Sequence, residues 1–406
     1  MSDRPRVSLA PGVLADGQLS QMLRDNLIQY PTARQPQVRP DPSALDLTLG
    51  TKAWKLKTSS RPTTRELEKI KRESDEQAPG TDAYGQYFHF EAKAIYLVQL
   101  QETLTLPPNL CGRGTGKSSV GRLDVITRLL TEHAQEYDTV PEDYDGNLYL
   151  LVSPQTFNIS VAPGSSLNQL RLVCGPQHAA VIDRHIIGHY GQPFWYVLKP
   201  GKVDEYVDWE RSLEPAESLV ADPRLFDLTV DLADPHHPFI YKAKEPPSNR
   251  QASTIDLREN VYSTLERGGY NPAEFFERIP VQREGADYFV ELAPQSFYIM
   301  KSKERLHIPV DVAVEVIAIS ERIGDIRIHY AGFAHPGFGT QRDDNRKGTP
   351  LIFEVRATDM PTKLFDGSLL ARMQLFRMSQ PAKPENTVYG SQELKLSKVF
   401  AEWPEG

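Results

Sequence analysis

The segment CGRGTGKSSVGRLD, Cys111 to Asp124, gathers glycines, two neighbouring hydroxyl groups and three cations in a chain of acidic overall charge. Glycine lets backbone N–H groups approach a ligand closely, hydroxyl groups donate hydrogen bonds, and Arg113, Lys117 and Arg122 supply positive charge. The segment therefore predicts a loop that holds an anion, with phosphate as the first choice. A basic surface loop without a ligand fits the composition equally well.

The run Gly-Lys-Ser also approaches the P-loop pattern G-x-x-x-x-G-K-[ST]. That pattern requires glycine at a position that Cys111 occupies here. Pro107 and Pro108 stand where a P-loop needs a buried strand, and the chain lacks the alternation of strands and helices found in such NTPases. The P-loop interpretation is therefore disfavoured.

Outside this segment the chain is predicted to be mainly β. Its 32 prolines lie between short runs of aliphatic and aromatic residues, which is typical of short strands and many turns. Strand-like runs follow one another from residue 87 to 173, and residues 43–50 alternate as a strand does. Apolar residues at helical spacing predict a helix over 17–28, a second short helix fits 119–133, and the charged residues 60–83 predict an exposed helix or loop.

Length and composition restrict the class of protein. A chain of 406 residues is expected to form two or three domains. No apolar run approaches the ~20 residues that span a bilayer, and the first residues lack a signal-peptide core, so we expect a cytoplasmic protein. Two cysteines give neither a disulfide framework nor a structural zinc site. A net charge of −8 argues against a general nucleic-acid binder.

Five short segments recur in the same order about 200 residues later, which predicts two copies of one mainly β domain. We place the first domain at 1–175, a connecting region with its own strands at 176–220 and the second domain at 221–406. The recurring pairs are LTLPPNL (104–110) with LHIPVDV (306–312), RLD (122–124) with RIG (322–324), LYLLV (148–152) with LIFEV (351–355), PGSSLNQL (163–170) with DGSLLARM (366–373), and SALDL (43–47) with STIDL (253–257).

Four motifs together resemble the dCTP deaminase family, which is related to the trimeric dUTPases, and most closely its long two-domain bacterial form. They are GKSSVGRL (116–123), AGFAHPGF (331–338), LIFEV (351–355), and the tail YGSQ (389–392) followed by LKLSK (394–398). The resemblance implies two tandem dUTPase-like distorted β-barrel (jelly-roll-like) domains with a few short helices. It also implies hydrolytic deamination of dCTP to dUTP and ammonia, Mg²⁺ carried by the triphosphate, a homo-oligomer with barrels in threes, and dTTP as a possible feedback inhibitor.

The resemblance also assigns roles to individual residues. Zinc deaminases use an H-x-E and P-C-x-x-C arrangement, which this chain lacks. The resemblance implies a metal-free route instead, in which one buried carboxylate acts as general base and acid. Glu354 matches this carboxylate, although its strand also alternates as an ordinary half-exposed strand does. The other matches are Ser118 and Arg122 for the water and the base, Lys117 and Ser119 for phosphate, Ala134 and Ala331 for the cytosine amino group, Asp138 for the sugar, Arg322 as the second counterpart of Arg122, and Tyr389 and Gln392 in the closing tail.

Neither copy matches the family completely. Lys117 replaces the usual arginine, and Leu151 occupies the place of the glutamate in the first copy. In the second copy IAISER (317–322) has lost the paired serines, and His335 replaces an aspartate. Three explanations fit: the two copies complement one another, the second copy works with a degraded phosphate site, or the protein binds nucleotides without catalysis. A dUTPase-like or bifunctional deaminase and pyrophosphatase is the alternative enzyme.

Overall fold

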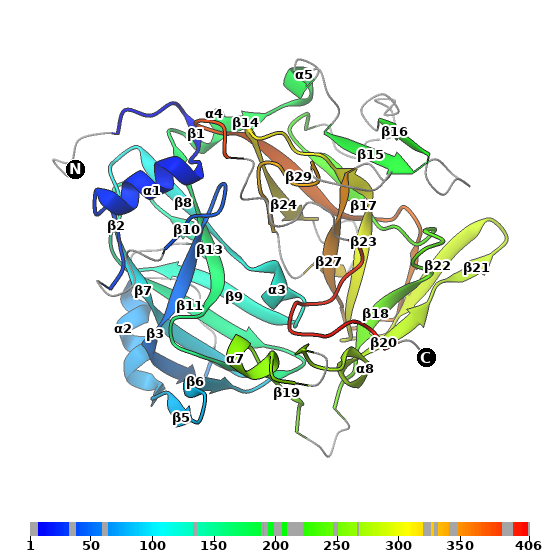
Figure 1. Ribbon diagram of the computed structural model, residues 1–406, viewed down its shortest axis with the longest axis horizontal. Helices are drawn as coiled ribbons and strands as arrows, with labels where there is room; N and C mark the ends of the chain where they lie inside the picture. The colour runs from blue at the N-terminus through cyan, green and yellow to red at the C-terminus, as the bar shows by residue number, and fades with distance from the viewer. Residues whose placement is uncertain are drawn as a thin grey trace. The chain divides into compact units, whose positions relative to one another are not determined.

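The computed structural model describes residues 7–31, 38–58, 64–132, 136–187, 190, 194–198, 205–208, 222–246, 251–265, 268–319, 326–328, 332–340, 348–383 and 393–404. The chain divides into two compact units, each built mainly of strands (Figure 1). Unit 1 comprises residues 1–177, 244–275 and 396–406, and unit 2 comprises residues 178–243 and 276–395. The mainly β fold predicted from the prolines and the short apolar runs is confirmed.

The main sheet of unit 1 has the strand order β10-β8-β13-β3-β7-β11-β9. Because β9 also lies beside β8, the sheet is nearly closed into a barrel. A smaller sheet has the order β19-β12-β6-β5. The elements of unit 1 are β1 (Gly12–Val13), α1 (Asp16–Arg24), β2 (Ile28–Gln29), β3 (Leu45–Leu56), α2 (Thr64–Glu73), β4 (Asp75–Gln77), β5 (Gly80–Asp82), β6 (Gly85–Phe90), β7 (Ile95–Thr105), β8 (Leu110–Gly116), α3 (Ser118–Gly121), β9 (Val125–Thr131), β10 (Thr139–Val140), β11 (Asp145–Pro154), β12 (Asn158–Val161), β13 (Ser166–Cys174), β19 (Thr254–Asp256), α7 (Glu259–Tyr262) and α8 (Pro272–Phe275).

The two helix predictions have different outcomes. The helix predicted over 17–28 forms as α1, which buries Leu19, Met22 and Leu23 on one face. The helix predicted over 119–133 is wrong beyond residue 121, because β9 pairs along its whole length with β11. The β-branched residues that open β9 favour this extended structure.

Two segments of unit 1 come from the part of the sequence that we assigned to the second domain. β19 pairs in parallel with β12, and this pairing places residues 244–275 with unit 1. The buried guanidinium of Arg258 fixes the segment further, because it binds Asp82 at 2.8 Å and Asp256 at 2.6 Å and lies 4.6 Å from the ring centre of Tyr87. Residues 396–406 form the other segment.

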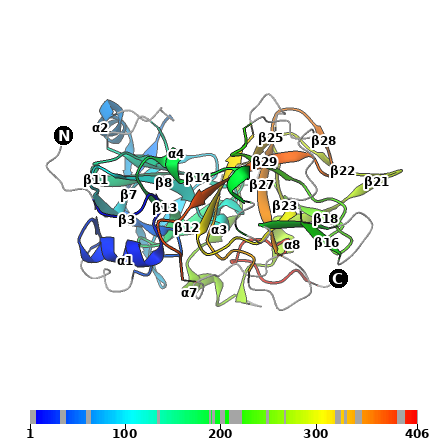
Figure 2. The same ribbon diagram turned by 90° about the horizontal axis from the view of Figure 1, so that it is seen from above.

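The residues described in unit 2 form three sheets and a large apolar core. Its β21–β22 hairpin extends away from the rest of the unit (Figure 1, Figure 2). The elements are α4 (Gln177–Ala180), which begins at the last residue of unit 1, β14 (Val181–Ile182), α5 (Arg184–Ile187), β15 (Trp195–Leu198), β16 (Tyr206–Asp208), β17 (Phe226–Thr229), β18 (Phe239–Ala243), β20 (Phe276–Pro280), β21 (Gln282–Glu284), β22 (Asp287–Leu292), β23 (Phe297–Leu306), β24 (Val312–Ala318), β25 (Ile326–Ile328), β26 (Phe333–Ala334), β27 (Thr349–Ala357), β28 (Thr362–Phe365) and β29 (Leu369–Arg377).

Several contacts of unit 1 recur in unit 2 at matching positions. In unit 1 the buried carboxylate of Glu102 accepts hydrogen bonds from the backbone N–H and the hydroxyl of Thr48. In unit 2 the carboxylate of Glu304 accepts the same two bonds from Thr229. The hydroxyls of two buried tyrosines likewise accept a bond from a backbone N–H five residues earlier, Tyr96 from Glu91 and Tyr298 from Ala293.

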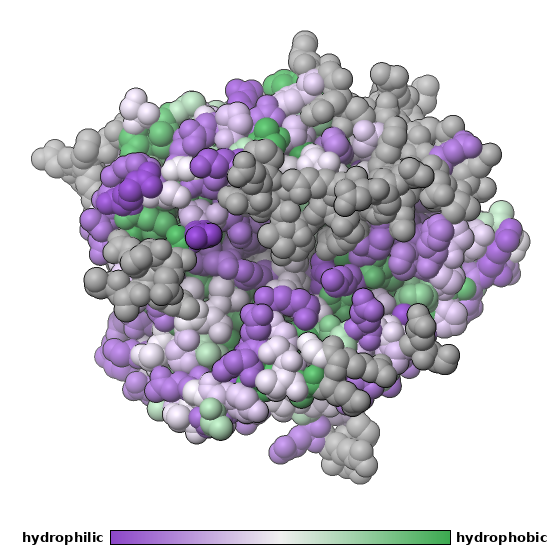
Figure 3. Space-filling model, in the orientation of Figure 1, coloured by the Kyte–Doolittle hydropathy of each residue, from purple (hydrophilic) through white to green (hydrophobic). Residues whose placement is uncertain are grey.

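No helix among the described residues is long and apolar enough to cross a membrane. On the face shown in Figure 3, hydrophobic residues lie in small areas among hydrophilic ones.

Candidate functional site

The first half of the predicted anion loop is a buried strand, β8, and its glycines have a packing role. A Cβ atom on Gly114 would lie 2.8 Å from Leu129, and one on Gly112 would lie 2.9 Å from Leu170. These glycines therefore let β8 approach neighbouring side chains of the barrel, and our prediction that they open the backbone to a ligand is wrong. The polar part of the segment begins at Lys117 and continues through α3.

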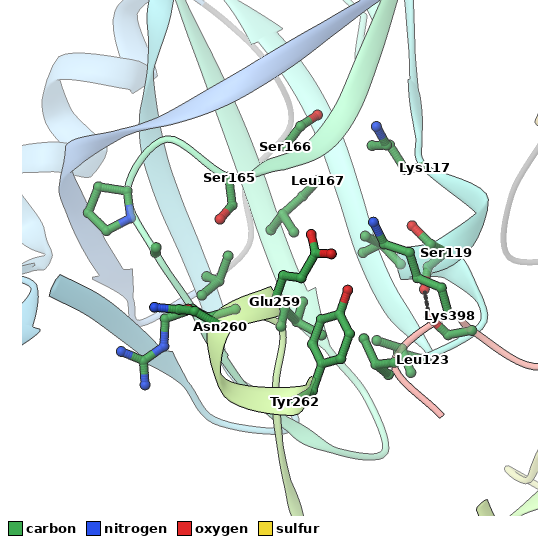
Figure 4. Close-up of a pocket in the computed structure, with 18 of the residues that line it drawn as sticks. Lys117, Ser119, Leu123, Ser165, Ser166, Leu167, Glu259, Asn260, Tyr262 and Lys398 are labelled. Carbon is green, nitrogen blue, oxygen red and sulfur yellow. Dashed lines mark hydrogen bonds between the residues drawn. The ribbon is translucent and has the colours of Figure 1, made fainter. Parts of the chain in front are cut away.

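A cavity of about 680 Å³ lies in unit 1 beside this polar part (Figure 4). Six stretches of chain line it: Asp46 on β3, the hairpin around Tyr84 and Gln86, the signature around α3, the turn before β13, residues 257–262 around α7 and the C-terminal segment. Its lining includes Lys117, Ser119, Leu123, Ser165, Ser166, Leu167, Glu259, Asn260, Tyr262 and Lys398.

The C-terminal segment lies against the signature. The hydroxyl of Ser397 donates a hydrogen bond of 2.6 Å to the carbonyl oxygen of Ser119. Arg122 Nη1 lies 3.5 Å from the carbonyl oxygen of Leu396, at the outer limit of a hydrogen bond. These contacts hold the last part of the predicted closing tail, LKLSK, next to the signature and bring Lys398 to the cavity.

The signature residues divide into two pairs. Lys117 and Ser119 line the cavity, but the ammonium group of Lys117 is already ion-paired with Asp46. Ser118 is exposed, Arg122 is 6% exposed, and neither lines the cavity. Two of the four predicted signature contacts therefore face the space where a ligand would fit.

Asp138 lies at the point where the barrel nearly closes. Its carboxylate accepts hydrogen bonds from Arg128 at 2.7 Å and from the backbone N–H of Leu129 at 2.8 Å, and its carbonyl oxygen accepts one from Gly114. Burial raises the pKa of this carboxyl, and Arg128 opposes the shift. Asp138 does not line the cavity, and its role near a sugar stays a prediction.

Glu354 lies in unit 2 on β27, and it is 4% exposed. Its neighbours Phe353 and Val355 are also buried, so the alternative of an ordinary half-exposed strand is wrong at this position. Glu354 pairs across the sheet with Ile299, as Leu151 pairs with Leu97 in unit 1. The matching register places Leu151 at the position that Glu354 occupies in unit 2.

Five of the predicted site residues cannot be placed. Ala134, Ala331, Arg322, Tyr389 and Gln392 lie outside the described residues. Their roles remain predictions from the resemblance.

Glu259, Tyr262 and Lys398 are among the polar side chains of the cavity that sequence reasoning did not assign to the site. Lys398 belongs to the tail motif, so the motif was a signal for it. Glu259 and Tyr262 lie in the segment that we assigned to the second domain, and no motif connects them with residues 117–123.

One cluster in the described part of unit 2 has donor atoms close enough for a metal ion: Asp234, His237 and Glu393. The ammonium group of Lys301 already lies there, paired with Asp234 and 3.8 Å from Glu393. Because Lys301 is buried and supplies the compensating positive charge, the cluster fits a metal ion poorly.

Unit 1 is a nearly closed β-barrel with a polar cavity, and unit 2 is also built mainly of strands, so the fold is that of a protein with two mainly β units. Models of the N-terminal and C-terminal domains of 2'-deoxycytidine 5'-triphosphate deaminase match residues 10–176 and 211–400, and the chain belongs to this family. The chain is 29% identical over 151 residues to a dCTP deaminase, dUMP-forming, of Parafrankia sp. (strain EAN1pec), covering 35% of this chain and 71% of the relative.

The crystal structure of 2'-deoxycytidine 5'-triphosphate deaminase from Agrobacterium tumefaciens is similar over nearly the whole chain. The TM-score is 0.72 at 27% sequence identity, and the match covers 92% of this chain and 100% of that one. The likeness therefore extends to both units.

Proposed function

We propose that this protein hydrolytically deaminates dCTP to dUTP and ammonia, with Glu354 as the proton carrier. The observation that carries the proposal is the burial of Glu354 on β27, within the part of the chain matched by the family's C-terminal domain. A carboxylate kept away from bulk water can take a proton from one bound water and pass it on without exchanging it with solvent.

In the proposed reaction a water oxygen attacks C4 of cytosine while Glu354 accepts one of its protons. Glu354 passes this proton to N3 of the ring to give a tetrahedral intermediate, and it then carries the proton of the new C4 hydroxyl group to the amino nitrogen. The bond between C4 and this nitrogen then breaks, ammonia leaves and the C4 oxygen becomes the carbonyl of uracil. Ser118 and Arg122 are proposed to position the water and the carboxylate, and Lys117 and Ser119 to contact phosphate.

The two units are proposed to be copies of one ancestral domain that have kept different parts of the site. The recurring Glu–Thr and Tyr contacts support this origin. Unit 1 keeps the signature but has Leu151, and unit 2 keeps Glu354 but has lost the paired serines in 317–322. The residues therefore make one complete set per chain.

Mg²⁺ is proposed to arrive with the triphosphate of the substrate, where it would neutralise phosphate charge. The poor fit of the Asp234–His237–Glu393 cluster supports this assignment over a metal held by that cluster. A cytoplasmic homo-oligomer with barrels arranged in threes and inhibition by dTTP are further expectations from the family.

A Glu354→Gln variant tests the proposal. Ammonia release from dCTP should fall by about 10²–10⁴-fold, because the amide cannot accept the water proton, whereas dCTP binding should persist. Glu291→Gln, an exposed carboxylate on β22, is the matched control and should keep full activity. Full activity of Glu354→Gln would disprove the assignment, and binding of dCTP by wild-type protein without turnover would favour a regulatory protein.

A bifunctional enzyme is the second candidate, and the printed name of the Parafrankia relative, dUMP-forming, favours it. Such an enzyme would also cleave the triphosphate. Chromatography of the products decides between the two: dUTP alone supports simple deamination, and dUMP with pyrophosphate supports the bifunctional reaction.

A further inference from the structure

Three polar side chains point into the cavity of unit 1 and have no hydrogen bond or ion pair with any residue that the structure describes. They are the carboxylate of Glu259, the hydroxyl of Tyr262 and the ammonium group of Lys398 (Figure 4). Other charges at the cavity are already compensated, since Lys117 pairs with Asp46 and Arg258 pairs with Asp82 and Asp256. The charged groups without such a partner are thus one carboxylate and one ammonium group, and the hydroxyls of Tyr262 and Ser119 also line the cavity.

This set fits a ligand that carries an anion at one end and a hydrogen-bond donor at another. Lys398 and the hydroxyl of Ser119 lie on the same side of the cavity, next to the contact between Ser397 and Ser119. Both donate, so this side suits phosphate oxygens. Glu259 comes from α7 and can only accept hydrogen bonds when ionised, so it suits an amino group.

Tyr262 adds no second negative charge to this arrangement. Burial raises the pKa of its phenol, and the neighbouring Glu259 raises it further. The hydroxyl therefore stays protonated, and the ring forms part of the cavity wall.

We propose that Glu259 is a specificity-determining residue that accepts a hydrogen bond from the exocyclic amino group of the cytosine nucleotide, while Lys398 and Ser119 hold its phosphates. The inference deepens the proposed function and rests on it. Uracil carries an oxygen acceptor where cytosine carries the amino group, so the same carboxylate repels the deaminated product. Glu259 would thereby favour dCTP over dUTP in the site.

The test measures binding of dCTP and dUTP by titration calorimetry in the full chain carrying Glu354→Gln, which prevents turnover. Adding Glu259→Gln should lower the preference for dCTP over dUTP by about 10-fold or more, because the amide can also donate to the uracil oxygen. Lys398→Ala should weaken the binding of dCTP and of dUTP to a similar extent and leave the ratio of the two affinities unchanged. Glu284→Gln removes an exposed carboxylate on the β21–β22 hairpin and is the control. It should change neither the affinity for dCTP nor the affinity for dUTP.

The outcomes separate this inference from the proposed function. If wild-type protein releases ammonia from dCTP but Glu259→Gln leaves the ratio unchanged, the role of Glu259 is disproved and the proposed function stands. If Glu259→Gln weakens the binding of both nucleotides, and does so only when Mg²⁺ is present, the role of Glu259 is also disproved, because Glu259 would then contact the metal ion. Failure of the wild-type protein to bind either nucleotide would overturn both proposals.

Discussion

Glu304 shows at the scale of one residue how burial changes the chemistry of a carboxyl group. It is 1% exposed, and its oxygens accept hydrogen bonds of 2.8 Å from the backbone N–H and the hydroxyl of Thr229. Burial raises its pKa to about 7, and the bonds from Thr229 oppose the shift. In the unfolded chain the same group titrates near 4.5.

Because the pKa of Glu304 differs between the folded protein and the unfolded chain, the free energy of unfolding depends on pH. Between pH 4.5 and 7 the folded protein keeps a proton that the unfolded chain releases, so this contribution to stability is complete below 4.5 and is lost as the pH rises through about 7. The loss is on the order of 3 kcal/mol. Glu304→Gln removes the titration and keeps the shape of the side chain.

We expect the stability of wild-type protein, relative to Glu304→Gln, to fall between pH 5 and pH 8. Urea unfolding at several pH values measures it. Glu284→Gln, whose carboxylate is exposed, should follow the wild-type curve. Parallel curves for wild type and Glu304→Gln would show that Glu304 does not titrate in this range.

Individual residues also show what the sequence can predict about a site. The burial of Glu354 was predictable because its strand is rich in Leu, Ile, Phe and Val. The ion pair between Lys117 and Asp46 was not, because it joins residues far apart in the chain and depends on how β3 and β8 flank β13 in the barrel. Glu259 and Tyr262 were not predicted for the same reason, because they lie far from the signature in the sequence.

At the scale of elements, β8 packs closely against β9 because Gly114 has no side chain. A Cβ atom at Gly114 would lie 2.8 Å from both Cβ and Cδ2 of Leu129 on β9. Leu129 is fully buried, so it has little freedom to move away. Gly114→Ala should therefore lower the free energy of unfolding by about 1–3 kcal/mol.

Thermal unfolding of Gly114→Ala and of a control measures this effect. Gly80→Ala on β5 is a suitable control, because its Cβ would meet the ring of Tyr87 at 3.5 Å, which is an ordinary contact. Equal melting temperatures for the two variants would contradict a packing role for Gly114.

Elements were predictable where the signal was local. Period-two patterns and prolines identified most strands between residues 87 and 173, and helical spacing identified α1. The helix predicted over 119–133 failed because all seven residues of β9 pair with β11, which lies later in the chain. The packing role of Gly114 was hidden for the same reason, since Leu129 contacts it only after the barrel forms.

At the scale of the whole molecule, the sequence predicted two mainly β domains but not which segments build them. The recurring motifs separate the two units near residue 175, yet residues 244–275 and 396–406 group with unit 1. Parallel pairing of β19 with β12 and the ion pairs of Arg258 account for the first of these segments. Such non-local contacts leave no periodic signal in the sequence.

The division of the site residues between the units predicts how many nucleotides one chain binds. Unit 1 has the signature and the cavity, with Leu151 at the position of the carboxylate. Unit 2 has Glu354, and the counterpart of the signature in 317–322 lacks the paired serines. Because each set of residues occurs once per chain, we expect titration calorimetry of Glu354→Gln with dCTP to give one site per chain. Replacing Lys398 by alanine in the same chain should weaken that single site, and two equivalent sites per chain would show that each unit binds a nucleotide independently.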